Sequence, residues 1–142
     1  MTPQEIKKVI TGGGLEVYRT TGHEVIVADR VRDNLILDSG VRVRTGSDQL
    51  EIRLIMGLRR GQYPNETNDQ LFGRLRHLAA PALDNGFAEV HAGVAPVNDP
   101  ADTKRTLDTF FELVLAKTIP TTDLLEDVRF ALSIAKTAES RH

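Results

Sequence analysis

The chain has 142 residues and a formal net charge of −2, and its length is typical of one domain. It contains no cysteine, which excludes disulfides, thiolate catalysis and Cys-ligated metal centres. The small negative charge provides no general attraction to nucleic acid or to anionic membranes. No apolar run reaches the ~20 residues of a membrane span, and the first ten residues lack the apolar stretch of a secretory signal. We therefore expect a cytoplasmic protein with no membrane partner.

The N-terminal segment predicts a helix over residues 3–11. Thr2 can cap this helix, Pro3 fits its first position, and Glu5 stands where a capping-box carboxylate reaches back. The glycines that follow would end the helix. Residues 15–19 can then form a short strand.

Residues 24–59 alternate apolar and polar side chains and predict three antiparallel strands. Residues 45–48 suit a two-residue hairpin turn with glycine at its first central position. A second turn at 32–34 would bring Val25, Val27 and Val31 onto the same apolar face. The turn at 45–48 predicts these cross-strand pairs: Val43 with Leu50, Arg42 with Glu51, Leu37 with Met56, and Leu35 with Leu58.

Two polar residues interrupt the apolar face of these strands. Ser39 would lie opposite Leu54. Asp29 is interpreted as a bulge or edge residue whose carboxylate reaches water, or alternatively as a buried acid with a raised pKa.

The second half of the chain predicts a helix over residues 67–83 that begins with a capping box of Thr67 and Gln70, a strand over 87–94 and a polar loop over 95–108. Residues 109–119 fit either a strand or a helix, and their β-branched and aromatic residues favour the strand. Asp123 can cap a final helix.

The predicted element order is helix, three strands, helix, two strands, helix. Residues 1–142 would form a single two-layer α+β domain, in which helices pack on an antiparallel sheet of about five strands.

Candidate catalytic residues are few. His91 could approach Asp29 with Ser39 nearby, but no strained turn positions a nucleophile. His23 and His77 lack the neighbouring ligands that a metal site needs. The sequence therefore predicts no catalytic residue, no metal site and no cofactor. A small-molecule enzyme or ligand-binding domain that uses Asp29 and His91, between sheet and helices, is the alternative.

Arginines are concentrated on or beside the three-stranded segment. A cross-strand ladder of ion pairs is the favoured interpretation. Binding of nucleic acid is the less favoured alternative, because the polar face offers no aromatic side chains on which bases would stack. The candidate partner-binding residues are Arg42, Arg44, Arg53, Arg59 and Arg60.

The element order and length, over residues 3–138, resemble the type III secretion chaperone-like fold. That group includes YbjN-type proteins, described as putative sensory transduction regulators. Secretion chaperones are distinctly acidic, whereas this chain has a pI near 6.1, so the resemblance to the YbjN-type branch is closer. The resemblance implies a non-enzymatic protein that dimerises and binds another polypeptide.

Apolar surface also favours a homodimer. As a strand, residues 109–119 direct Phe111, Leu113 and Leu115 to one face and Phe110 and Val114 to the other. Strands that are apolar on both faces normally have both covered. A second copy of the chain would supply the cover, whereas a helix at 109–119 would remove the need for it.

Overall fold

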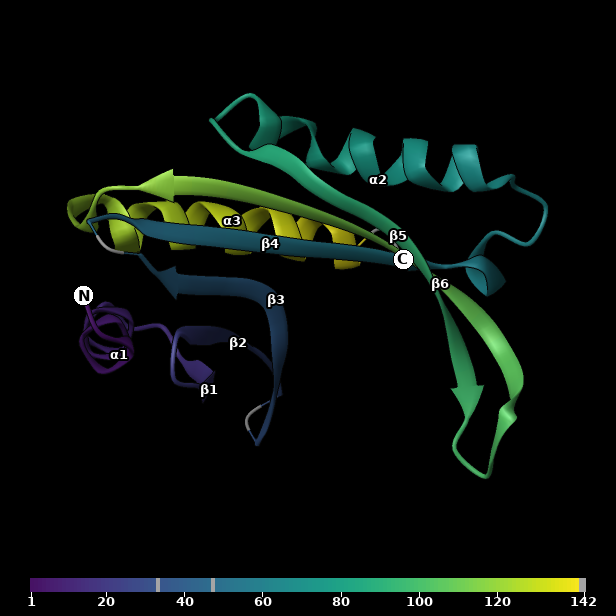
Figure 1. Cartoon of the computed structure of the whole chain (residues 1–142), viewed down its shortest axis with the longest axis horizontal. Helices are drawn as coiled ribbons and strands as arrows, with labels where there is room; N and C mark the ends of the chain where they lie inside the picture. Colours follow the sequence, from purple (N-terminus) through teal and green to yellow (C-terminus); the bar gives the residue numbers. More distant parts are fainter. Residues whose placement is uncertain (33, 47, 141–142) are drawn as a thin grey trace.

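The computed structural model describes residues 1–32, 34–46 and 48–140, in which three α-helices accompany one antiparallel sheet of six strands (Figure 1). The strand order is β1-β2-β3-β4-β6-β5. In chain order the elements are α1 (Pro3–Gly12), β1 (Val17–Thr20), β2 (Glu24–Arg32), β3 (Leu35–Thr45), β4 (Leu50–Arg59), the 3-10 turn η1 (Arg60–Gln62), α2 (Asn68–Leu83), β5 (Ala88–Asp99), β6 (Asp102–Ile119), the 3-10 turn η2 (Thr121–Asp123) and α3 (Leu124–Ser140).

The α+β class is confirmed, but the sheet has one strand more than the predicted five. The additional strand is β1, which pairs with β2 through Val17 and Val27. The strand interpretation of residues 109–119 is confirmed, because they form the second half of β6. Two capping boxes begin α1 and α2 as predicted, with Thr2 and Thr67 as the caps.

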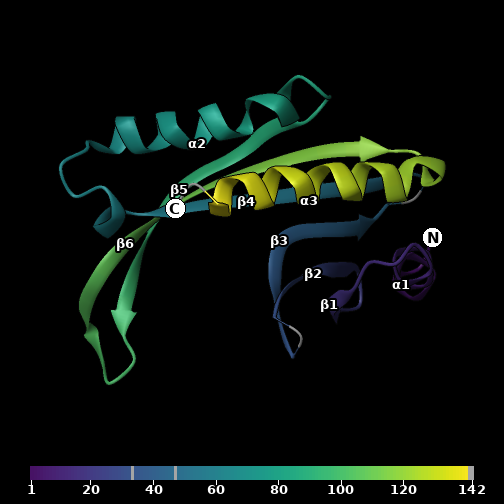
Figure 2. The same ribbon diagram turned by 180° about the vertical axis from the view of Figure 1, so that it is seen from behind.

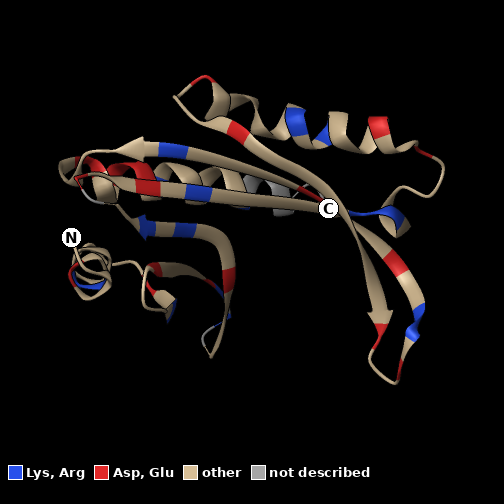
Figure 3. Cartoon of the chain, in the orientation of Figure 1, with Lys and Arg blue, Asp and Glu red and all other residues tan. Residues whose placement is uncertain are grey.

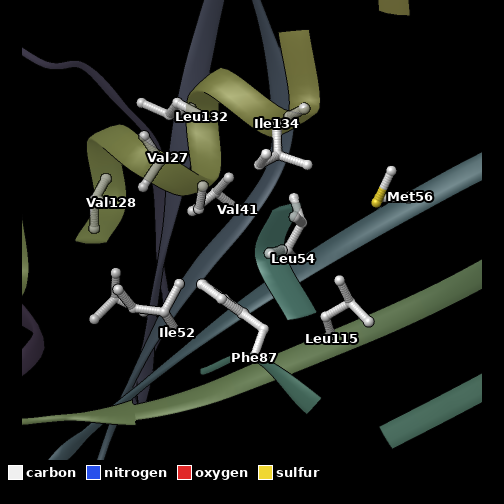
Figure 4. Close-up of a cluster of buried hydrophobic side chains, with 14 of the residues drawn as sticks. Val27, Val41, Ile52, Leu54, Met56, Phe87, Leu115, Val128, Leu132 and Ile134 are labelled. Atoms are coloured by element: carbon white, nitrogen blue, oxygen red, sulfur yellow. The ribbon is translucent and has the colours of Figure 1, made fainter. Parts of the chain in front are cut away.

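The three α-helices pack on the same face of the sheet. Helix α3 lies behind the strands in Figure 1 and in front of them in Figure 2. Helix α3 packs on β3 and β4. Helix α1 covers β1 and β2, and α2 covers β4, β6 and β5. In the core, Val128, Leu132 and Ile134 of α3 lie near Val27 and Val41 (Figure 4). The buried residues of one sheet face thus form the core of the domain.

The predicted register of β3 and β4 is wrong by two residues. Val43 pairs with Ile52 and Arg44 pairs with Glu51. Thr45 pairs with Leu50, so four residues join the strands where two were predicted. Because side chains alternate with a period of two, this shift leaves each of them on its predicted face.

A bulge in β3 changes the rest of the predicted meander. Between the pairs Ile26–Arg42 and Ala28–Asp38, β3 contains two more residues than β2. The Ser39 hydroxyl is buried in this bulge, where it donates to the Val27 carbonyl at 2.6 Å and accepts from the Val41 N–H at 3.1 Å. The hydroxyl therefore satisfies backbone groups that the irregular ladder leaves without partners.

On the N-terminal side of the bulge, β3 leaves β4 and forms an arm with β2, which we call the first arm (residues 28–32 and 34–38) (Figure 1). Ser39 therefore does not face Leu54, which pairs with Val41. The predicted pairs of Leu37 with Met56 and Leu35 with Leu58 do not form, because both leucines lie on the arm and are 45% exposed.

The predicted polar loop at residues 95–108 is also wrong. Strand β5 continues to Asp99 and β6 begins at Asp102, so residues 94–108 form a second arm (Figure 1). Pro96 belongs to β5, the outermost strand, and edge strands are where sheets tolerate proline. The Asp99 carboxylate accepts from the Ala101 N–H at the tip.

Two predicted turns contain residues outside the described part of the chain. These residues are Asp33 and Ser47. The side chain of Val31, predicted on the apolar face, also lies outside it.

We predict that Gly40→Ala destabilises the fold by about 1–3 kcal/mol. Gly40 has a φ of +83°, and a Cβ atom there would lie 2.5 Å from the Ile55 carbonyl oxygen. Urea unfolding followed by circular dichroism measures the change. Gly22→Ala is the matched control, because no atom lies within 4 Å of a Cβ placed there. Equal stability of the two variants would contradict the requirement for glycine in the bulge.

Candidate functional site on the open face of the sheet

We call the sheet face opposite the helices the open face. Most buried apolar residues belong to the core beneath the helices. Val114 and Ile26 are also buried, but they lie outside that core and point to the open face. Val114 pairs with Ile55 of β4, and the two contribute to an apolar patch that Phe110 completes. The prediction that β6 is apolar on both faces is confirmed. Ile55, Phe110 and Val114 are hereafter called the apolar patch.

Two glycines shape the surface around the apolar patch. A Cβ atom on Gly57 would lie 2.0 Å from Cζ of the Phe110 ring, so this ring occupies the space above the glycine. A Cβ atom on Gly93 would lie 2.6 Å from Nε2 of His91. The missing side chains on β4 and β5 therefore let both rings lie flat along the sheet.

Three of the five predicted partner-binding arginines come together at the other end of the open face (Figure 3). Arg42 lies directly opposite Arg53, and Arg44 lies opposite Glu51. Like charges in direct opposition destabilise a sheet. Each arginine here has its own carboxylate: Asp38 for Arg42 at 2.7 Å, Glu51 for Arg53, and Glu24 for Arg44 at 3.7 Å. The three acids neutralise the three bases, but only the pair of Arg44 and Glu24 joins two strands, so the predicted cross-strand ladder forms in part.

Arg59 and Arg60 do not join this group. Arg59 ends β4, and Arg60 belongs to η1 at the opposite end of that strand. The Arg60 guanidinium lies 5.1 Å from the centroid of the Phe111 ring, on the helix side of the sheet. It also donates to the Glu66 carbonyl at 2.7 Å. Arg60 thus fastens the segment before α2 to the core.

The pair of Glu24 and Arg44 is incompletely satisfied. Glu24 Oε1 and Arg44 Nε are both buried and lack a hydrogen-bond partner among the described residues. Beside Arg44, the surface has a hollow of about 370 Å³ that also touches Gln49, Glu51 and Thr118.

A hollow of about 450 Å³ lies on the helix side between α2 and the end of β4. Two of its polar residues, Glu66 and Arg74, already pair with one another. Arg74 forms an ion pair with Glu66 at 2.7 Å and lies 4.0 Å from the Tyr63 ring centroid. The hydrogen bond from Arg74 lowers the pKa of the Glu66 carboxyl below its usual value. These pairs connect α2 to the segment that precedes it.

The structure separates the residues of the predicted alternative catalytic group. Asp29 lies on β2 and His91 on β5, with β3, β4 and β6 between them. Four strand spacings correspond to roughly 19 Å. The Ser39 hydroxyl, in turn, is bonded to the backbone of the bulge. Asp29, Ser39 and His91 therefore do not form a triad.

Asp29 is 8% exposed and lies opposite Leu37 in the first arm. It lines a hollow of about 220 Å³ with Glu16, Arg30 and Lys136, among others. The Arg30 guanidinium binds Glu16. Asp29 lies on β2 just past the pair of Ala28 and Asp38 that ends the bulge. It is buried, whereas the interpretation as a bulge or edge residue predicted a carboxylate that reaches water.

Within residues 1–32, 34–46 and 48–140, no group of three or more His, Asp or Glu side chains is arranged to hold a metal ion. Among the same residues, no helix is long and apolar enough to cross a membrane.

Comparison of the chain with protein-family models, with curated proteins and with solved structures finds no match. The fold and the open face alone therefore define its class: a two-layer α+β domain with one sheet face left without helices.

Sequence reasoning missed Ile55 and Glu112 of the open face and both arms. The available signal for Ile55 and Glu112 was alternation, which assigns a face to each residue once the strands are known. Nothing in the local sequence indicates that the opposite face has no helix above it, because that depends on where all three helices pack.

One surface ion pair predicts a pH dependence. Arg76 of α2 binds Glu89 of β5 at 2.8 Å, and this hydrogen bond lowers the pKa of Glu89 below its ordinary value of 4.5. A carboxyl group whose pKa is lowered in the folded state stabilises the fold at pH values above its ordinary pKa. This stabilisation is lost as the pH falls through the lowered pKa of the folded state. We expect Glu89→Gln to lower the unfolding free energy by about 0.2–1 kcal/mol at pH 7. The difference should vanish well below pH 4.5.

Urea unfolding at a series of pH values measures this effect. Arg76→Gln and the double variant complete a double-mutant cycle. Additive losses in the double variant would show that the two side chains do not interact.

Proposed function

We propose that the chain is a non-enzymatic polypeptide-binding domain of the chaperone-like or regulatory kind, that it acts as a homodimer, and that the open face is its binding surface. The observation that carries the proposal is the position of the apolar patch on a sheet face without helices, where Phe110 and Ile55 are half-buried. Apolar surface of this kind marks sites of protein interaction.

The charges beside the apolar patch support a polypeptide as the partner. The Arg42, Arg44 and Arg53 ladder is neutralised by its carboxylates, so it provides little net attraction for the phosphates of nucleic acid. An apolar centre beside a polar, ion-paired rim is the usual arrangement of a protein interface.

The two arms support the homodimer. Leu35, Ile36 and Leu37 of the first arm are 36–45% exposed, and Val94 and Leu107 of the second arm are 50% and 55% exposed. Between residues 35 and 38, β3 pairs with β2 and with no other described strand, so one backbone edge faces outward. Exposed apolar edges of this kind readily pair with another chain. A second copy would cover them, since symmetric dimers are the commonest soluble oligomers.

We predict that Phe110→Ser weakens binding of an unfolded polypeptide by about tenfold to a hundredfold, because the loss of one buried aromatic side chain costs about 1.5–3 kcal/mol. The probe is a reduced, carboxymethylated and fluorescently labelled small protein, and fluorescence anisotropy measures its binding. Leu83→Ser is the matched control, because Leu83 is 39% exposed but lies on α2. Absence of binding to the natural sequence, or equal loss in both variants, would refute the open face as the binding surface.

We further predict a dimer in sedimentation equilibrium at micromolar concentration, with a mass of twice 15.7 kDa. Leu35→Ser combined with Leu37→Ser should shift the equilibrium toward the monomer, because both side chains are exposed on the first arm. Circular dichroism checks that the variant remains folded. A monomer mass at all concentrations would contradict the homodimer, and an unchanged dimer in the variant would exclude the first arm from its contact.

A further inference from the structure

A single row of residues crosses the open face beside the apolar patch. Gly57 of β4 pairs with Glu112 of β6, and Glu112 pairs in turn with Gly93 of β5. Directly paired residues of antiparallel strands share a face. Glu112 is therefore the one side chain of this row that rises above the sheet, with a glycine on either side.

Two rings lie over the flanking glycines. The Phe110 ring occupies the space above Gly57, and the His91 ring lies beside the position of a Gly93 Cβ atom. Phe110 and His91 belong to the same face as Glu112, because Phe110 is two residues away on β6 and His91 pairs with Val114. The Glu112 carboxylate thus has an aromatic ring on its β4 side and an imidazole on its β5 side. We call these five residues the Glu112 site.

The charge of Glu112 is unbalanced. Asp38, Glu24 and Glu51, the carboxylates at the other end of the open face, each have an arginine partner. Glu112 is half-buried and forms no ion pair or side-chain hydrogen bond with any described residue. Arg59 is the nearest cation by register, since it pairs with Phe110, but it does not reach the carboxylate. An unpaired carboxylate on this face is complementary in charge to a cationic ligand.

We infer that the Glu112 site binds an arginine side chain of the partner polypeptide. The inference rests on the proposed function and specifies the chemistry of the partner. A planar guanidinium can donate two hydrogen bonds to one carboxylate while its face stacks on an aromatic ring. Phe110 provides that ring. The neighbouring residues of an extended partner would contact Ile55, which is half-buried on the same face, so its sequence would combine arginine with apolar residues.

The test compares two peptides that differ only in charge. One is a seven-residue peptide with a single arginine between valine and threonine residues, and the other has citrulline, a neutral analogue of the same shape, in place of arginine. Both are titrated into the protein of natural sequence by isothermal calorimetry at low salt. We expect the arginine peptide to bind about tenfold more tightly, and Glu112→Gln to reduce this ratio to about one. A higher salt concentration should reduce the ratio in the natural sequence.

Glu126→Gln is the matched control, because it makes the same change in net charge on α3, away from the sheet face. It should leave the arginine-to-citrulline ratio unchanged. Equal reduction in both variants would show a general effect of charge and would overturn the Glu112 site. Equal affinity of the two peptides for the natural sequence would also overturn it. The proposed function would still stand if the unfolded polypeptide bound and Phe110→Ser weakened that binding, so the two failures are distinguishable.

Discussion

The packing of all three helices on one side of the sheet is the constraint on which the other features depend. Each helix buries its apolar stripe against the same face, with Ile10 of α1, Leu75 of α2 and Val128 of α3 fully buried. No helix is then left for the opposite face. The strands still alternate, so half of their side chains point to a surface that the chain itself does not cover. The apolar patch and Glu112 owe their position to this arrangement.

The bulge at Ser39 and Gly40 is the second determinant. A regular ladder would continue β3 alongside β4 to its end. The bulge instead directs the residues that precede Val41 away from β4. The first arm therefore projects from the sheet and exposes Leu35 and Leu37. A buried hydroxyl and a left-handed glycine together make this conformation possible. Bulges commonly stand where a strand must bend or stop pairing.

Electrostatics divides the open face into two halves with different properties. Around Arg42 and Arg53, opposite charges lie on adjacent positions and satisfy one another, so this half is polar but nearly neutral. Around Glu112, the directly paired positions are glycines, and the Phe110 and His91 rings lie beside them. The sheet therefore joins a half whose charges pair with one another to a half on which Glu112 forms no ion pair with any described residue. A partner that lies across both halves would find its specific contact at the second.

Local chemistry allowed much of the fold to be predicted from the sequence. The capping boxes at Thr2 and Thr67, the α+β class and the faces of β3, β4 and β6 all follow from short-range patterns. Even the two-residue error in register preserved the faces, because side-chain alternation has a period of two.

Tertiary structure decided what the local pattern does not contain. The bend at Gly40 depends on the Ile55 carbonyl, fifteen residues away, and the second arm depends on an edge position that tolerates Pro96. The separation of Asp29 from His91 and the isolation of Glu112 depend on strand order, which places β6 between β4 and β5. The sequence by itself determined which side chains share a face. Only the packing of the helices determined which face is covered, because burial depends on contacts between segments distant along the chain.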